Sequence, residues 1–195
     1  MDRLVVKGKN KLSGNVIISG AKNAAVAVIP AAIMAEDVCI IDNLPYIEDV
    51  KCLYTTLNKM GAVCSYEDKH TLKIDSSGEL ETKVTFEEVR KMRASYYLLG
   101  ALLARYKKAE VAMPGGCNFG TRPIDLHLKG FKALGAEVEF NGEVVCVKAE
   151  KLHGADIYMD TVSVGATINI MLAATMAEGT TTTPDFFIFQ AFLFR

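Results

Sequence analysis

The segment Ala31-Ala32-Ile33-Met34-Ala35-Glu36-Asp37 recurs near the far end of the chain as Ala173-Ala174-Thr175-Met176-Ala177-Glu178-Gly179. A looser copy, Leu102-Leu103-Ala104-Arg105, lies about halfway between the two. Three copies at this spacing predict a unit of roughly 70 residues that occurs three times. A polar turn and a short strand pattern follow each copy, at residues 38–41, 109–113 and 180–183.

The second half of the unit repeats as well. Apolar residues recur at helical spacing in residues 50–62 and, at a constant offset, in residues 124–136. Both helices are expected to end at a glycine, Gly61 or Gly135, because glycine is best suited to the left-handed position after a helix. The predicted unit is therefore helix, strand, helix, strand, strand.

Two strand pairs are expected after these helices, 63–66 with 71–74 and 137–140 with 144–147. Asn141-Gly142 joins the second pair and predicts a type I′ hairpin turn. The first helix of each unit is small and apolar nearly all round, which predicts that it lies buried inside a layer of sheets. These helices are expected at residues 24–34, 96–104 and 168–177.

Length and composition predict a globular protein with a sizeable core. The chain has 195 residues, half of them are hydrophobic, and its formal net charge is −1. This balance argues against a nucleic-acid partner, because such proteins carry clustered basic charge. The longest apolar run, residues 24–35, contains Pro30 and is too short to span a bilayer, so no membrane association is expected. We therefore expect a cytoplasmic protein.

The five cysteines support neither a disulfide framework nor a metal site. Their number is odd, no CxxC pair occurs, and no histidine lies nearby at metal-ligand spacing. Cys39 and Cys146 lie in strand-like runs and are expected to pack in the core. His127 falls in a predicted helix, where a surface or capping position is the expectation.

One cysteine differs from the others in its surroundings. Cys117 lies in a glycine-rich loop that follows the apolar run 111–113, so the thiol is expected on a loop and not in the core. Glycines allow backbone N–H groups to approach an anion, and Arg122 would favour the thiolate and grip a phosphate or carboxylate. These residues predict a reactive thiol beside an anion site. The alternative, an inert turn cysteine with a solvated Arg122, stays open on these residues alone.

Five motifs, in order along the chain, resemble those of a known family. With them the chain is similar to the enolpyruvyl transferases, and within that family to the branch that acts on UDP-N-acetylglucosamine. The resemblance covers residues 2 to 181 and implies the family's α/β fold, an inside-out α/β barrel domain of βαβαββ-like repeats whose third repeat is incomplete here. The motifs are Gly20-Ala21-Lys22-Asn23-Ala24-Ala25, Met92-Arg93-Ala94-Ser95, Pro114-Gly115-Gly116-Cys117, Gly120-Thr121-Arg122-Pro123-Ile124-Asp125-Leu126-His127-Leu128 and Ser163-Val164-Gly165-Ala166-Thr167.

The resemblance also implies an activity and a site. The enolpyruvyl group of phosphoenolpyruvate would pass to the 3′-hydroxyl of UDP-N-acetylglucosamine, the first committed step toward the bacterial cell-wall precursor, with neither metal nor organic cofactor. Cys117 would be the catalytic acid and nucleophile, and Lys22, Asn23 and Arg122 would bind phosphoenolpyruvate. The positions that match the family's nucleotide-sugar site are Arg93, Arg122, Pro123, Ile124, Asp125, Leu126, Ser163, Val164 and Gly165.

The domain organisation departs from the family pattern. Family members are about twice as long. The resemblance implies that residues 1–19 form a strand that packs with a second domain, missing here, and that residues 20–181 form the first domain. Residues 182–195 are a phenylalanine-rich tail that does not match the family. A shifted reading frame and a genuine tail both remain open, as does a partner chain that supplies the second domain. The 195-residue chain is expected to be inactive alone.

Two other functions compete with this prediction. The shikimate-pathway enolpyruvyl transferase has Asp-Lys-Ser where this chain has Ala21-Lys22-Asn23, and it lacks the loop of residues 114–117, which argues against it. The other alternative is a module that binds the nucleotide sugar without catalysis. Loss of half of the contacts and of the exclusion of water would then weaken binding.

Overall fold

The elements of the first two predicted units are confirmed. The structure is a computed structural model that describes residues 3–85, 87, 93–113 and 124–183. The first unit consists of α1 (Lys22–Ala32), β1 (Val38–Ile41), α2 (Glu48–Lys59), β2 (Val63–Tyr66) and β3 (Leu72–Asp75). The second consists of α4 (Tyr97–Tyr106), β5 (Lys108–Ala112), α5 (Asp125–Ala133), β6 (Glu137–Phe140) and β7 (Val144–Lys148), preceded by β4 (Lys83–Val84) and the 3₁₀ helix η1 (Arg93–Tyr96).

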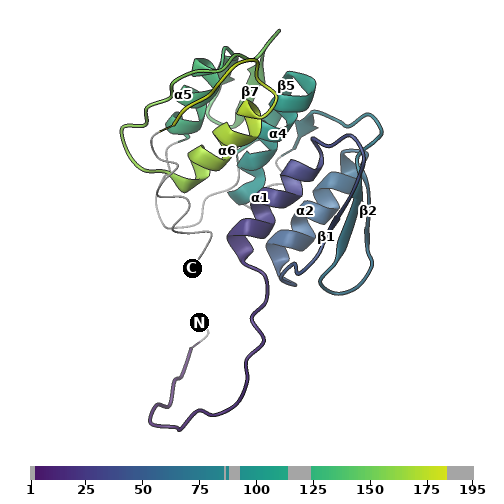
Figure 1. Ribbon diagram of the computed structural model, residues 1–195, viewed down its shortest axis with the longest axis vertical. Helices are drawn as coiled ribbons and strands as arrows, with labels where there is room; N and C mark the ends of the chain where they lie inside the picture. The colour runs from purple at the N-terminus through teal and green to yellow at the C-terminus, as the bar shows by residue number, and fades with distance from the viewer. Residues whose placement is uncertain (1–2, 86, 88–92, 114–123, 184–195) are drawn as a thin grey trace.

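Each unit forms its own small sheet. In the first sheet β3 lies between β1 and β2 and pairs antiparallel with both, so that Ile74 stands opposite Cys39 on one side and Cys64 on the other. In the second sheet the order is β4-β5-β7-β6, with β4 parallel to β5 and the other pairs antiparallel. In Figure 1 helices α1 and α4 lie between the two sheets.

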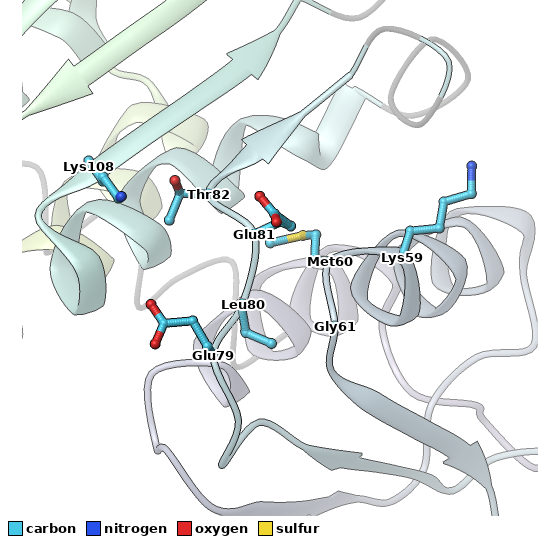
Figure 2. A pocket seen from close by; sticks show the side chains of 8 residues that line it. All are labelled: Lys59, Met60, Gly61, Glu79, Leu80, Glu81, Thr82 and Lys108. Atoms are coloured by element: carbon cyan, nitrogen blue, oxygen red, sulfur yellow. The ribbon is translucent and has the colours of Figure 1, made fainter.

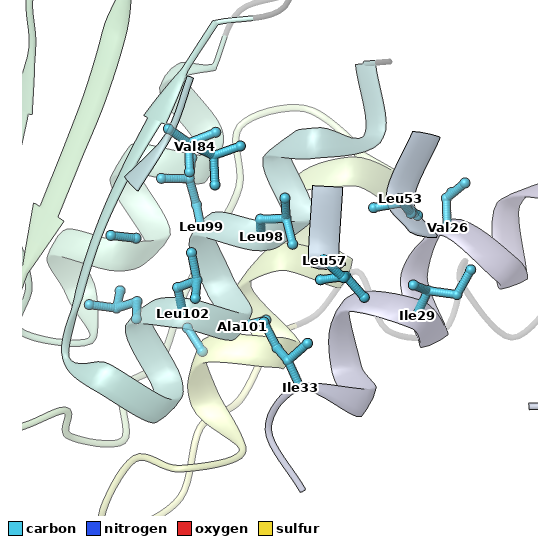
Figure 3. Close-up of a cluster of buried hydrophobic side chains, with 14 of the residues drawn as sticks. Val26, Ile29, Ile33, Leu53, Leu57, Val84, Leu98, Leu99, Ala101 and Leu102 are labelled. Atoms are coloured by element: carbon cyan, nitrogen blue, oxygen red, sulfur yellow. The ribbon is translucent and has the colours of Figure 1, made fainter. Parts of the chain in front are cut away.

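The helices that open the units form the core, as predicted. In α4 every residue from Leu98 to Ala104 is buried, because the helix packs against α1 on one side and α6 (Val164–Ala174) on the other. Figure 3 shows Leu98 and Leu102 of α4 among the apolar side chains of Ile33 at the end of α1 and Leu57 of α2. All four side chains are fully buried. A helix that is covered on several sides has no face in contact with water, which explains why residues 98–104 are all apolar.

The third unit differs from the prediction after its helix. No strand forms over residues 180–183; instead, two isolated parallel bridges pair His153 with Glu178 and Asp156 with Thr182. The two chain segments approach closely, since a methyl group on Gly154 would lie 2.3 Å from the carbonyl oxygen of Thr180. The segments therefore meet at single points and do not form a continuous ladder.

The glycines at the ends of the second helices are confirmed, whereas the hairpin turn is not of the predicted type. Gly61 and Gly135 have φ values of 105° and 93°, in the left-handed region. A type I′ turn needs positive φ at both central residues, but only Gly142 (φ 95°) has it and Asn141 does not. The carboxamide oxygen of Asn141 instead accepts from the backbone N–H groups of Glu143 and Val144, at 3.0 and 2.8 Å.

Residues 3–21 form an extended arm that precedes α1 and projects from the domain (Figure 1). The arm contains neither helix nor strand, and its apolar side chains lie in solvent, with Leu4 93% and Ile17 97% exposed. A strand that pairs with a second domain therefore stays a prediction. No helix in the described ranges is long and apolar enough to cross a membrane.

Candidate functional site

Helices α1, α2 and α4 begin on the same side of the domain. The Lys22 ammonium in the first turn of α1 forms an ion pair with the carboxylate of Asp49 in the first turn of α2. At the other end, the guanidinium of Arg105 near the end of α4 donates to the carbonyl oxygen of Ile33, which follows the last residue of α1, at 2.8 Å. The first turn of α1 meets the first turn of α2, and the end of α1 meets the end of α4. The N-termini of the three helices therefore lie on one side of the domain.

Helices α5 and α6 begin on this side too. A methyl group built on Gly165, in the first turn of α6, would lie 3.6 Å from Nε2 of His127 in the first turn of α5 and 3.9 Å from the hydroxyl oxygen of Tyr97, the first residue of α4. Five helix N-termini therefore face one side. Because each N-terminus carries a partial positive charge and unpaired N–H groups, this side favours an anionic ligand.

The structure brings together most of the described residues that were predicted to bind substrates. Lys22 and Asn23 open α1, the backbone of Arg93 opens η1, Ile124 to Leu126 open α5, and Ser163 to Gly165 open α6. All of them therefore lie at helix starts on the shared side. Cys117, Arg122 and Pro123 lie outside the described residues, so their predicted roles stay predictions.

The predicted phosphoenolpyruvate residues of α1 are accessible to a ligand. Lys22 has a side chain that is 61% exposed, and its ammonium faces a carboxylate, Asp49, that is 20% exposed. Asn23 is exposed as well. An exposed lysine whose counter-ion is a protein carboxylate can exchange that partner for the phosphate of a ligand, because an ion pair that water reaches from one side is weak.

The start of α6 is capped on one side and open on the other. The Ser163 hydroxyl accepts from the backbone N–H of Ala166 at 3.3 Å, and the Ser163 carbonyl oxygen accepts from the Thr167 hydroxyl at 3.0 Å. The N–H groups of Val164 and Gly165 have no acceptor within the described ranges. These two donors are therefore free to bind a ligand oxygen, as expected for a helix N-terminus.

The predicted nucleotide-sugar residues of α5 divide into buried and exposed ones. Ile124, just before the helix, is 5% exposed and anchors its start, Leu126 is half-buried, and Asp125 is exposed. The exposed carboxylate of Asp125 lies in the first helical turn, where a negative charge is favourable. Of these three residues, Asp125 is the one whose side chain is both polar and accessible to a ligand.

His127 is the residue that the sequence analysis misjudged. The expectation of a surface or capping position is wrong, because the side chain is only 7% exposed. Burial lowers the pKa of His127 to about 4, so the imidazole is neutral at neutral pH. Its Nδ1 lies 3.0 Å from Nδ2 of Asn169, and its ring lies 5.6 Å from that of Tyr96. A signal was present in the sequence: Asn169 interrupts the apolar run of α6, and a buried amide requires a polar partner.

Cys64 packs in the core, and Cys39 and Cys52 pack against it. The prediction that Cys146 packs in the core is wrong, because Val145 and Val147 point into the core and Cys146, between them, lies on the other face of β7. None of Cys39, Cys52, Cys64 and Cys146 forms a disulfide, and each is buried or half-buried. Burial raises the pKa of Cys64 to about 11, which leaves that thiol protonated and unreactive. In the parts of the chain that the structure describes, no group of three or more His, Cys, Asp or Glu side chains is arranged to hold a metal ion.

A pocket of about 440 Å³ lies at the end of α2, and so away from the shared helix starts; Figure 2 shows the side chains that line it. It is formed where α2 ends and β5 begins, and it contains none of the predicted site residues. Its lining carries two lysines and two glutamates, so it has no marked charge preference. The lining residues are Lys59, Met60, Gly61, Glu79, Leu80, Glu81, Thr82 and Lys108.

The two sheets around parallel helices make this an α/β domain, and solved structures of enolpyruvyl transferases share its fold. The enolpyruvyl transferase NikO from Streptomyces tendae has a TM-score of 0.76 at 25% identity, over 95% of this chain and 45% of NikO. EPSP synthase from Acinetobacter baumannii has a TM-score of 0.71 at 20% identity, over 87% of this chain and 40% of the synthase, and supports the fold alone. The predicted fold class is confirmed.

The sequence identifies the family. Residues 6–189 match the family model described as EPSP synthase (3-phosphoshikimate 1-carboxyvinyltransferase), and the chain belongs to this family of 1-carboxyvinyl transferases. A UDP-N-acetylglucosamine 1-carboxyvinyltransferase of Clostridium botulinum is 58% identical over 93% of this chain and 44% of its own length. A UDP-N-acetylglucosamine 1-carboxyvinyltransferase 2 of Listeria monocytogenes is 52% identical over 92% of this chain and 42% of its own length. The chain thus spans less than half the length of these curated relatives.

Proposed function

We propose that this chain carries substrate-binding and catalytic residues for transfer of the enolpyruvyl group from phosphoenolpyruvate to the 3′-hydroxyl of UDP-N-acetylglucosamine. The observation that carries the proposal is the 58% identity, over 93% of the chain, to a relative named for that reaction. The product would be the first committed precursor of the bacterial cell wall, made in the cytoplasm.

The reaction explains why the predicted residues are a thiol and cations. The 3′-oxygen of the sugar forms a bond to C2 of phosphoenolpyruvate while C3 takes a proton, and the hydroxyl proton goes to a base. The C2–oxygen bond to phosphate then breaks as C3 loses a proton, which restores the double bond and releases phosphate. Cys117 would supply the proton to C3 and can also attack C2 through its sulfur.

The described residues support the binding half of this proposal. Phosphoenolpyruvate and the nucleotide diphosphate are both anionic, and the shared side of the domain presents the Lys22 ammonium and the free N–H groups at the start of α6. Lys22 and Arg122 would offset the negative charge of the phosphate and carboxylate as the tetrahedral intermediate forms. Asn23, next to Lys22, would donate or accept a hydrogen bond where the two substrates meet.

The choice of acceptor rests on local sequence. The description of the family model names 3-phosphoshikimate as the acceptor, whereas the names of the relatives at 58% and 52% identity contain UDP-N-acetylglucosamine. Ala21-Lys22-Asn23 and Pro114-Gly115-Gly116-Cys117 are the motifs that favour the nucleotide sugar. We therefore propose UDP-N-acetylglucosamine as the acceptor.

Calorimetry on the 195-residue chain tests the acceptor. Titration with UDP-N-acetylglucosamine is expected to give heat of binding, and titration with shikimate 3-phosphate is expected to give none. The reverse result would contradict the proposed function. A phosphate-release assay with both substrates then tests the separate prediction that the chain is inactive alone, which turnover above background would refute.

Mass spectrometry tests the role of Cys117 without requiring turnover. Fosfomycin, a phosphonate epoxide, is expected to alkylate Cys117 and to leave Cys39 and Cys64 unmodified, because Cys64 is buried and its pKa is raised. Lys22→Ala is the matched variant, since it removes a cation that would hold the phosphonate, and slower labelling is expected. An unlabelled Cys117 under saturating reagent would contradict the proposed chemistry.

A further inference from the structure

A buried hydrogen-bond network joins α4, α5 and α6 directly behind the shared helix starts. The Asn169 carboxamide on α6 accepts from the backbone N–H of Gly100 at 2.8 Å and donates to the carbonyl oxygen of Tyr96 at 2.7 Å. The same Nδ2 lies 3.0 Å from Nδ1 of His127 on α5. Asn169 is completely buried, so these contacts replace the hydrogen bonds to water that the amide loses on folding.

The two backbone partners fix the orientation of the Asn169 amide and, through it, the proton of His127. A backbone N–H only donates and a carbonyl oxygen only accepts, so Oδ1 faces Gly100 and Nδ2 faces Tyr96. Nδ2 has two hydrogens, and the second is directed to Nδ1 of His127. Nδ1 must therefore be the unprotonated nitrogen, and the neutral imidazole carries its proton on Nε2.

The Nε2 edge of the imidazole faces the start of α6. A methyl group on Gly165 would lie 3.6 Å from both Cε1 and Nε2 of His127, and 3.9 Å from the hydroxyl oxygen of Tyr97. His127 is only 7% exposed, yet no residue of the described ranges accepts a hydrogen bond from its Nε2. The Nε2–H group and the Tyr97 hydroxyl thus lie beside Gly165, in the helix turn whose Val164 and Gly165 N–H groups have no acceptor within the described ranges.

We propose that Asn169 is a positioning residue that holds the proton of His127 on Nε2, so that His127 and Tyr97 present uncharged donors to an acceptor oxygen of the nucleotide sugar at the start of α6. The identity of the ligand rests on the proposed function, whereas the position of the proton depends only on this chain. Burial, which disfavours the imidazolium, keeps His127 an uncharged donor at neutral pH.

Nuclear magnetic resonance of the ¹⁵N-histidine-labelled chain tests the position of the proton. Long-range ¹H–¹⁵N correlations at pH 7 are expected to show His127 as the neutral tautomer protonated on Nε2. A proton on Nδ1, or an imidazolium at pH 7, would overturn the proposal. Asn169→Asp replaces the Nδ2 donor by a carboxylate oxygen, so a proton is expected to appear on Nδ1, a change that loss of packing alone would not produce.

A pair of variants tests the donor itself. His127→Gln places an amide nitrogen close to the position of Nε2, whereas His127→Asn places one close to Nδ1 and has nothing at Nε2. In calorimetry with UDP-N-acetylglucosamine, His127→Asn is expected to bind about tenfold more weakly than the unmodified chain, the effect of one lost hydrogen bond. His127→Gln is expected to stay within about threefold.

The outcomes separate the two proposals. Equal affinities of the two His127 variants would overturn the donor role, whether both bind well or both bind weakly. Absence of binding by the unmodified chain would contradict the proposed function, and the tautomer of His127 would still decide the positioning role of Asn169.

Discussion

The guanidinium of Arg105 donates to the carbonyl oxygen of Ile33 at 2.8 Å and so ties the end of α4 to the end of α1. It also donates to the carbonyl oxygens of Ser76 at 2.7 Å and Gly78 at 3.0 Å. The side chain of Arg105 is only 7% exposed, and the Glu36 carboxylate lies 4.0 Å away. A planar guanidinium can reach three carbonyl groups at once, which a single ammonium does less well.

Arg105→Met is therefore expected to lower the free energy of unfolding by about 2–4 kcal/mol, because three carbonyl groups lose a charged donor. Arg105→Lys is expected to retain part of the stability. Urea denaturation measures both. Lys148→Met is the control, since Lys148 forms an exposed ion pair with Glu137 at 2.9 Å. A loss of at most about 0.5 kcal/mol is expected there, and equal losses at the two positions would contradict the role of Arg105.

Gly100 permits the close approach of α4 and α6. A methyl group at this position would lie 2.3 Å from the backbone oxygen of Asn169 and 2.4 Å from its carboxamide oxygen. Gly100→Ala is therefore expected to destabilise the chain by about 1–3 kcal/mol, although alanine is normally the better helix former. The unfolding midpoint in urea measures the effect. A shift of the backbone amide signal of residue 100 in the nuclear magnetic resonance spectrum shows that the effect arises at this position.

Gly78→Ala is the matched control for Gly100→Ala. A methyl group on Gly78 meets nothing within 4 Å, and its φ is not in the left-handed region. The substitution is expected to change the free energy of unfolding by about 0.5 kcal/mol or less, or to stabilise the chain slightly through the unfolded state. If both variants were equally stable, the contact between Gly100 and Asn169 would not be as close as the structure has it.

The stability of the chain is expected to fall between pH 6.5 and pH 4 because of His127. Its pKa is about 4 in the folded chain and 6.5 in the unfolded chain. Between these values the unfolded chain binds more protons, so the free energy of unfolding rises with pH. The contribution is fully present above pH 6.5, and about 3 kcal/mol of it is lost by pH 4.

The comparison with His127→Gln isolates this effect. Carboxylates such as Asp160, whose pKa is lowered by the hydrogen bond from Lys129, also lose stabilising interactions in acid. They titrate below their ordinary range in both proteins, so the difference between the two unfolding curves reports His127. A constant difference from pH 7 to pH 4 would contradict the lowered pKa.

Much of the fold could be predicted because the repeat depends on local sequence features, namely the spacing of apolar residues and the glycines that end the helices. The strands at residues 63–66 and 137–140 have the predicted bounds, since each follows a helix-ending glycine that fixes where the next element begins. The third unit was predicted less well. A strand requires a partner strand, and the β-propensity of residues 180–183 does not indicate which segment would pair with them. There, Thr182 meets Asp156 in a single bridge.

The site could be predicted only in part. The motifs predict that Lys22, Asp125 and Ser163 bind substrates, and the structure adds that all three lie at helix starts on one side. The polar Asn169 in an apolar run indicated that a partner was needed, but not that the partner is His127, which lies 42 residues away in sequence. Such a contact depends on how α5 packs on α6, and helical periodicity alone does not determine that packing.

The Lys22–Asp49 ion pair gives a further prediction about phosphoenolpyruvate. If Lys22 binds the phosphate as proposed, the carboxylate of Asp49 competes with the ligand for the same ammonium. Asp49→Asn is therefore expected to bind phosphoenolpyruvate about two- to fivefold more tightly, which corresponds to the small energy of a partly exposed ion pair. Calorimetry at low ionic strength, where screening is weakest, measures the change.

Glu48→Gln is the control that separates pairing from net charge. Glu48 lies beside Asp49 in the first turn of α2 and carries the same charge, but it is exposed and forms no ion pair within the described ranges. Both substitutions remove one negative charge, so a general electrostatic effect would strengthen binding equally in both. A larger gain for Asp49→Asn, together with loss of binding in Lys22→Ala, is expected if the Lys22 ammonium exchanges its protein carboxylate for the phosphate of the substrate.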